Sequence, residues 1–185
     1  TGLGFSAAHA GLIYAVIPAA IVFIAPASGA LSDRFGTRRL SVAGLCIALA
    51  GMGGATAAVW AASTMPLSRG EVLAWALPAF FLAGVGVAVF QSPNNSAAMS
   101  AVPRESLGVG GGLLAAMRNI GMACGMAIAG AVVGGHSAAT GAATQSPALF
   151  RSLAMGLLAG TAFVLLALLF SLWRDDAPIA RSASA

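Results

Sequence analysis

The chain has 185 residues, of which 59% are hydrophobic and 8% are charged. An average soluble domain has about 25% charged residues, which keep its surface hydrated. This chain has too few charges to cover a surface, and its mean hydropathy is +0.92. The composition therefore excludes an ordinary soluble domain and predicts an integral membrane protein.

The charged residues fall between long apolar runs. No Asp, Glu, Lys or Arg occurs in the intervals 1–32, 40–68, 72–103, 119–150 and 152–173. About 20 apolar residues cross a bilayer as a helix, and these continuous runs lack the alternation of membrane barrel strands. We predict an all-α membrane protein with five transmembrane helices and a polar tail, over about 10–31, 40–62, 73–94, 108–135, 149–173 and 174–185.

The arginines predict how these helices are oriented. Outside the helices, six arginines lie on one side of the bilayer: Arg34, Arg38, Arg39, Arg104, Arg174 and Arg181. On the other side lie Arg69 and Arg151. Because basic residues are retained in the cytoplasm, we expect a multi-pass protein of the plasma (cytoplasmic or inner) membrane with a cytoplasmic C-terminus. The N-terminus then lies outside, so we expect at least one further helix upstream.

One stretch joins the first and second helices and reads Gly29-Ala-Leu-Ser-Asp33-Arg34-Phe-Gly36-Thr-Arg38-Arg39-Leu40. Gly36 allows a tight turn. Asp33 could accept hydrogen bonds from amides at a helix N-terminus or pair with an arginine. Isolated charges here would only fix topology, but the complete string GxLxDRxGxRR favours a further role.

A second stretch lies at the expected end of the third helix. Gly84 and Gly86 permit close approach of another helix. Pro93 removes one helical donor and disfavours helix at the residue before it. The polar side chains Gln91, Asn94, Asn95 and Ser96 satisfy the freed backbone groups in one interpretation. In the other, Pro93 is a hinge and these side chains line the inner mouth of a transport path.

The fourth expected helix combines many glycines with one arginine. The glycines that we assign to helix packing are Gly112, Gly121, Gly125, Gly130 and Gly134. Arg118 interrupts the apolar run, and an arginine within a bilayer costs several kcal/mol unless it faces protein or water. We keep two roles open for Arg118 and its neighbour Asn119: structural pairing, with Asp33 as a candidate partner, or contact with substrate or coupling ion.

The string GxLxDRxGxRR resembles the signature loop of the major facilitator superfamily. The resemblance implies that the loop is a cytoplasmic latch between two halves of a transporter, a role that falls on Gly29, Asp33, Arg34, Gly36, Arg38 and Arg39. Below, residues 29–40 are called the signature loop.

The other two stretches, joined by Val102-Pro103-Arg104-Glu105, resemble the fourteen-helix drug/proton antiporter branch of that superfamily, the EmrB/QacA type. That likeness includes the sequence Arg118-Asn119-Ile-Gly121 and extends from residue 1 to about 173. It implies that the five helices form most of the C-terminal half of a major facilitator fold, with the missing N-terminal half as partner.

The resemblance implies secondary active efflux of small amphipathic substrates, cations among them, by alternating access. The proton motive force is the implied energy source, without a bound cofactor. No carboxylate lies inside the five spans, so we expect the coupling acids in the missing half. Alternatives are a major facilitator transporter for a different solute or a non-catalytic membrane scaffold.

Other function classes lack their sequence signals. The chain contains no HExxH or GxSxG motif, so we do not expect an enzyme. Cys46 and Cys124 have no metal-ligand spacing, so we expect no metal site. The basic residues are spread over several connections rather than gathered in one patch, so we expect no nucleic-acid partner. The lipid bilayer is the expected surrounding.

Overall fold

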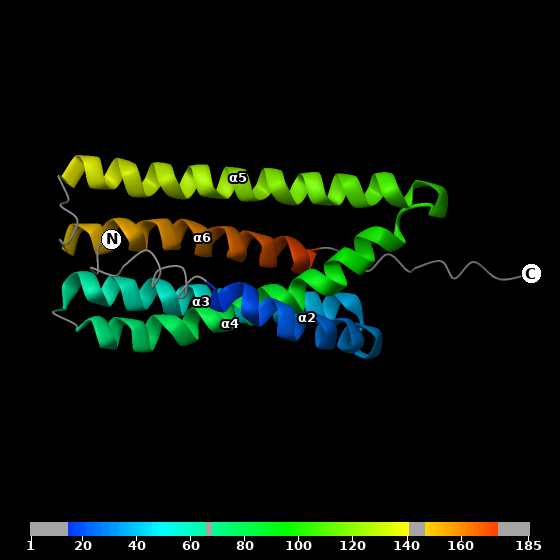
Figure 1. Cartoon of the computed structure of the whole chain (residues 1–185), viewed down its shortest axis with the longest axis horizontal. Helices are drawn as coiled ribbons and strands as arrows, with labels where there is room; N and C mark the ends of the chain where they lie inside the picture. Colours follow the sequence, from blue (N-terminus) through cyan, green and yellow to red (C-terminus); the bar gives the residue numbers. More distant parts are fainter. Residues whose placement is uncertain (1–14, 66–67, 141–146, 174–185) are drawn as a thin grey trace, which may run out of the picture.

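The computed structural model describes residues 15–65, 68–140 and 147–173. All regular structure in these ranges is helical, which confirms the all-α prediction (Figure 1). The helices are, in chain order, α2 (Val16–Phe35), α3 (Thr37–Thr64), α4 (Arg69–Ser100), the short 3-10 helix η1 (Arg104–Ser106), α5 (Leu107–Thr140) and α6 (Pro147–Trp173).

Four of these helices, α3 to α6, are long and apolar enough to cross a bilayer. The helix α2 carries a shorter apolar segment over Val16–Ser32. The first part of the span expected over 10–31 lies outside the described residues, and so does the expected tail 174–185. The described part of the chain therefore has four helices of spanning length and a fifth, shorter apolar helix.

Local sequence explains where two of the helices begin. Gly36 has φ 83° and ψ 146°, a backbone conformation that suits glycine, and it alone separates α2 from α3. A capping box begins α4, because the Glu71 N–H donates to Ser68 Oγ at 3.3 Å and the Ser68 N–H donates to Glu71 Oε2 at 2.7 Å.

The helix α4 extends further than the sequence suggests. We expected it to end near 94, whereas it continues through Pro93 to Ser100. A proline inside a helix leaves one carbonyl without its usual donor, so the helix can persist only if another group supplies that bond. The donor comes from α2 and belongs to the site described below.

Small residues allow the helices to pack closely. The helix α3 packs against α4 and α6, and α2 lies against α4. Gly44 and Gly51 are buried along α3. A Cβ built on Gly44 would lie 2.9 Å from Gly86 O of α4, and one built on Gly51 would lie 2.8 Å from Ala79 O. At these positions the two backbones are too close for any larger residue.

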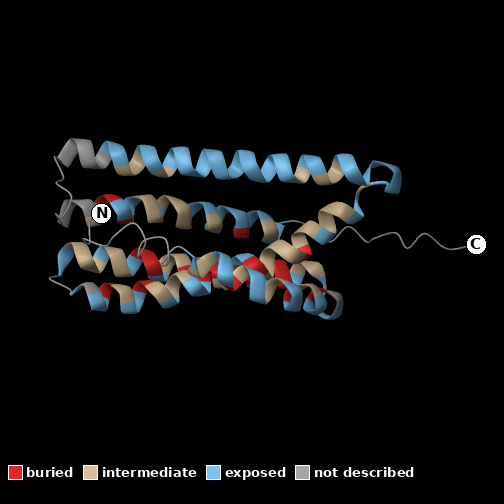
Figure 2. Cartoon of the chain, viewed as in Figure 1, coloured by how far each residue is buried: buried red, intermediate tan, exposed pale blue. Residues whose placement is uncertain are grey.

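The helix α5 is far less covered than the others. It lies alongside α6 and meets α4 only near its own start (Figure 1). None of its most apolar 18-residue window is buried, and nearly the whole helix is exposed in Figure 2. The described chain therefore leaves one long apolar helix without a full set of neighbours.

Candidate functional site

The signature loop occupies the end of α2, Gly36 and the start of α3. This defines the Gly36 end of the bundle, toward which the end of α4 and the start of α5 also lie (right in Figure 1). Gly29 faces α4, since a Cβ there would lie 3.4 Å from Ser92 Oγ. Arg34 and Arg39 are exposed. The side chain of Asp33 is outside the described part, so its predicted partners are not tested.

Arg38 reaches the last helix of the chain. Its Nη2 donates a hydrogen bond to Leu172 O at 3.0 Å. Leu172 lies in the last turn of α6, where backbone carbonyls have no partner within the helix and the negative end of the helix dipole lies. Arg38 therefore caps the end of α6, a contact that the sequence does not reveal because it joins residues 134 apart.

Ser28 supplies the bond that Pro93 removes. In a regular helix the N–H of residue 93 would donate to the carbonyl of Val89, but proline has no N–H. Ser28 of α2 is 2% exposed, and its hydroxyl donates to Val89 O at 3.0 Å. Pro93 itself is fully buried at this crossing. The proline is therefore compensated by a neighbouring helix rather than by the polar residues that follow it.

Arg118 of α5 and Asn95 of α4 are joined directly. Arg118 Nη2 donates to Asn95 Oδ1 at 3.1 Å. The pair connects the two stretches that the sequence singled out separately, and it makes Asn95 the structural partner of the intramembrane arginine. Side chains on a helix lean toward its N-terminus, which directs Arg118 toward the Gly36 end, where Asn95 lies.

The helix α4 accepts both of these interhelical hydrogen bonds and therefore lies at the centre of the site. On one side of Pro93, Val89 accepts from α2, and on the other side Asn95 accepts from α5. Both hydrogen bonds involve a side chain, so neither is fixed by helix geometry alone. A tilt or bend of α4 at the proline would change both contacts at once.

The remaining polar candidates are near the pair without a bond to it. Gln91 and Asn94 are half-buried, and Asn119 is exposed. Within the described residues, no hydrogen bond of these three side chains is found. They lie close in sequence to Asn95 on α4 and to Arg118 on α5 without a hydrogen bond to the pair.

The expected packing glycines divide into two groups. Gly84 and Gly86 lie at contacts of α4, because a Cβ on Gly84 would lie 3.0 Å from Ile17 O and one on Gly86 would meet the backbone of Ala48. The glycines of α5 behave differently. A Cβ built on any of them would meet nothing within 4 Å: Gly112, Gly121, Gly125, Gly130 and Gly134. These five do not pack against any described helix of this chain, so the packing role assigned to them stays a prediction.

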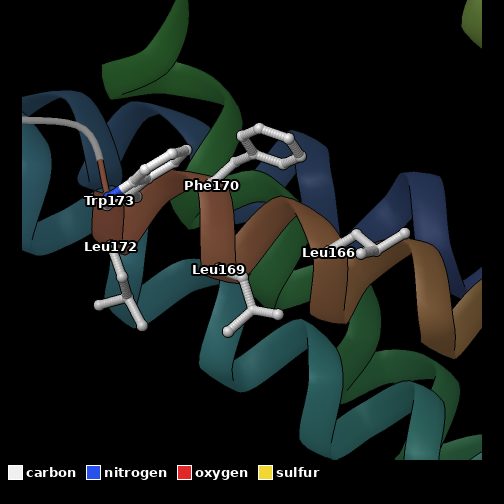
Figure 3. A pocket seen from close by; sticks show the side chains of 5 residues that line it. All are labelled: Leu166, Leu169, Phe170, Leu172 and Trp173. Atoms are coloured by element: carbon white, nitrogen blue, oxygen red, sulfur yellow. The ribbon is translucent and has the colours of Figure 1, made fainter.

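The exposed end of α6 forms an apolar hollow of about 480 Å³. Figure 3 shows its five lining side chains, with Phe170 and Trp173 on one side of the helix and Leu169 and Leu172 pointing the other way. Of its described lining side chains, the Trp173 indole is the one that can form a hydrogen bond. This surface suits contact with lipid, and a tryptophan at the end of a spanning helix, as Trp173 is, is typical of the headgroup region.

The other reactive side chains that the structure describes do not gather into a site. Cys46 and Cys124 are free and exposed. Among the described residues, no group of three His, Cys, Asp or Glu side chains could hold a metal ion. At the end opposite Gly36, the Arg151 guanidinium lies 5.7 Å from the ring centroid of Trp60, which ties the start of α6 to α3.

The chain matches the family model of the Major Facilitator Superfamily over residues 1–185. The chain belongs to this superfamily. It is therefore a multi-pass membrane protein of a transporter family, and the signature loop is the feature of the sequence that resembles this family.

Curated relatives support the same assignment. The chain is 32% identical to the multidrug resistance protein Stp of Mycobacterium tuberculosis over 74% of this chain and 24% of that protein. It is 35% identical to the riboflavin transporter RibZ of Clostridioides difficile over 64% of this chain and 24% of that protein. The uncharacterized transporter YebQ of Escherichia coli is 32% identical over 69% of this chain and 26% of that protein. No solved structure matches. The chain spans about a quarter of the length of these major facilitator relatives.

Proposed function

We propose that this major facilitator chain is part of a proton-coupled efflux antiporter of the fourteen-helix drug/proton branch, located in the plasma membrane with its Gly36 end in the cytoplasm. Its substrates would be small amphipathic molecules. The observation that carries the proposal is the hydrogen bond between Arg118 and Asn95 at 3.1 Å, which links α5 to the proline-containing segment of α4. The likeness to the multidrug resistance protein Stp supports efflux.

Alternating access needs elements that change their contacts without unfolding. The helix α4 has such an element, since the carbonyl of Val89 depends on the Ser28 hydroxyl rather than on a donor within α4. A side-chain hydrogen bond breaks and reforms more easily than a helical turn. Pro93 then acts as the hinge, and the movement reaches α5 through Arg118.

The uncovered helix α5 offers a surface for a partner in the complete protein. None of its most apolar window is buried, and its glycines leave room for close approach of another helix. We assign this face to the N-terminal half of the same transporter. The signature loop at the same end of the bundle would then latch the two halves on the cytoplasmic side.

The efflux proposal predicts two variants with impaired transport. The full-length transporter is reconstituted into vesicles with an imposed pH gradient, and transport of ethidium and riboflavin is followed by fluorescence. We expect gradient-dependent transport of at least one dye, and a loss of about tenfold or more in Asp33→Asn and in Arg118→Ala. The first substitution removes the charge of the proposed latch, and the second removes the charge-assisted hydrogen bond to Asn95.

The control is Arg151→Ala, because Arg151 lies at the opposite end of the bundle, over Trp60. This variant should transport at close to the wild-type rate. Both Asp33→Asn and Arg118→Ala could transport at the wild-type rate while all variants are equally well inserted. That result would show that the two residues serve packing and not transport. A transport rate that does not depend on the pH gradient would contradict the proposed proton coupling.

A further inference from the structure

Arg118 differs from every other described charge in its depth. It lies in α5, which begins at Leu107, so the rise of 1.5 Å per residue places its Cα about 16 Å from the start of the helix. The remaining arginines with described side chains lie at or near helix ends. Arg118 is therefore a positive charge inside an apolar helix of spanning length rather than at a helix end.

No described carboxylate neutralises this charge. Within the described side chains, the hydrogen bond to Asn95 is the contact found for Arg118. Glu71 lies in the first turn of α4 and Glu105 lies in η1, both outside hydrogen-bonding reach of Arg118. Asn95 is neutral, so the pair keeps a full positive charge. A charge at this depth calls for an anion or water as a further neighbour.

The Arg118–Asn95 pair also presents hydrogen-bond donors rather than acceptors to a ligand. A guanidinium has five N–H donors and no acceptor, so Asn95 must present its oxygen to Arg118, as it does. The amide N–H groups of Asn95 are then left to donate elsewhere. Donors on both α4 and α5 thus point to a ligand group that accepts several hydrogen bonds. A carboxylate or phenolate meets both requirements, charge and acceptor count.

Apolar side chains flank the arginine along the same helix. Met122, one turn further along α5 and on the same face as Arg118, is 52% exposed, and Leu114, one turn before Arg118, is half-buried. A flexible thioether and an aliphatic side chain beside a guanidinium suit a molecule with an apolar body and one anionic group. A lipophilic cation would instead place its charge against that of Arg118.

We infer that Arg118 and Asn95 form the binding site for the anionic group of an amphipathic organic acid, so that the transporter selects acids over cations of similar shape. This inference rests on the proposed transport function and names its substrate class. Asn95 orients the guanidinium and donates to the same group, and Arg118 supplies the charge.

The test measures binding separately from transport. Fluorescein, which is anionic at neutral pH, and tetramethylrhodamine methyl ester, a cation on the same xanthene scaffold, are bound to the purified full-length transporter in detergent. Fluorescence anisotropy gives both dissociation constants. We expect wild type to bind fluorescein more tightly than the cation. Arg118→Gln should bind fluorescein on the order of tenfold to a hundredfold more weakly, the loss that follows from removing a charged hydrogen-bond partner.

Binding by a second variant and binding of the cation provide two further tests of the inference. Arg118→Lys keeps the charge but loses the planar fork, so it should bind fluorescein better than Arg118→Gln and less well than wild type. Arg118→Gln should bind the cation as well as wild type or better, which also shows that the variant is folded. Equal fluorescein binding by wild type and Arg118→Gln, or no fluorescein binding by wild type, would overturn the inference. Arg118-dependent binding without transport would leave the site in place and refute the efflux proposal.

Discussion

Gly51→Ala should destabilise the protein by about 1–3 kcal/mol, the usual cost of overpacking a close contact. A Cβ on Gly51 would lie 2.7 Å from Ala83 Cα and 2.8 Å from Ala79 O of α4. These are backbone atoms, and the neighbour cannot yield by rotating a side chain. The helices α3 and α4 must therefore move apart along their whole contact, which loses packing at Gly44 and Gly86 too.

Gly53→Ala is the matched control on the same helix. A Cβ on Gly53 would meet nothing within 4 Å, so the substitution should stabilise α3 by up to about 1 kcal/mol through helix propensity. Thermal unfolding of the full-length transporter in detergent should thus shift in opposite directions for the two variants. Equal shifts of the same sign would mean that α3 and α4 do not pack through Gly51.

Ser28→Ala should cost about 1–3 kcal/mol, because it leaves the part-buried carbonyl of Val89 without a donor. The cost should fall sharply when Pro93 is also replaced. In Pro93→Ala, residue 93 regains its N–H and can donate to Val89 O within α4. The Ser28 hydroxyl is then no longer needed. We expect a coupling energy of at least about 1 kcal/mol between the two substitutions.

The four proteins of this cycle are compared by their free energies of unfolding in mixed micelles. Ser100→Ala is the control, since its hydroxyl donates to Ala97 O of its own helix at 2.9 Å and lies exposed at the end of α4. That variant should differ from wild type by less than about 0.5 kcal/mol. Additive effects of Ser28→Ala and Pro93→Ala would show that the serine does not compensate the proline.

Features set by neighbouring residues were readable from the sequence. Charge-free runs gave the helices, and Gly36 gave the break between α2 and α3, because a left-handed residue in a tight connection is a local demand on glycine. The motif around Asp33 indicated the superfamily by its amino-acid sequence alone. Each of these signals lies within one short stretch of chain.

Features set by contacts between distant residues were not readable. Pro93 suggests a helix end, and only the crossing with Ser28, 61 residues away, explains why α4 continues. Asn95 was a candidate of the transport path, but nothing in the sequence pairs it with Arg118. Gly44 and Gly51 went unnoticed because small residues occur throughout the chain, and spacing alone does not tell which of them meet another backbone.

The glycines of α5 show a further reason why helix contacts could not be predicted from the sequence. Gly121 and Gly125 have the spacing of a packing motif, yet nothing within 4 Å would meet a side chain there. The spacing indicates that another helix can approach α5 closely, but it does not identify that helix. In our account the approaching helix belongs to the other half of the transporter.

The central claim, that α5 is covered by the N-terminal half, can be measured by photo-crosslinking. Benzoylphenylalanine is introduced at Met126, which is 71% exposed on α5, in a full-length transporter with a protease site between its halves. After irradiation and cleavage, we predict that the two halves stay joined on a denaturing gel, while the unirradiated sample separates. Halves that separate equally with and without irradiation would contradict the account, because α5 would then face lipid.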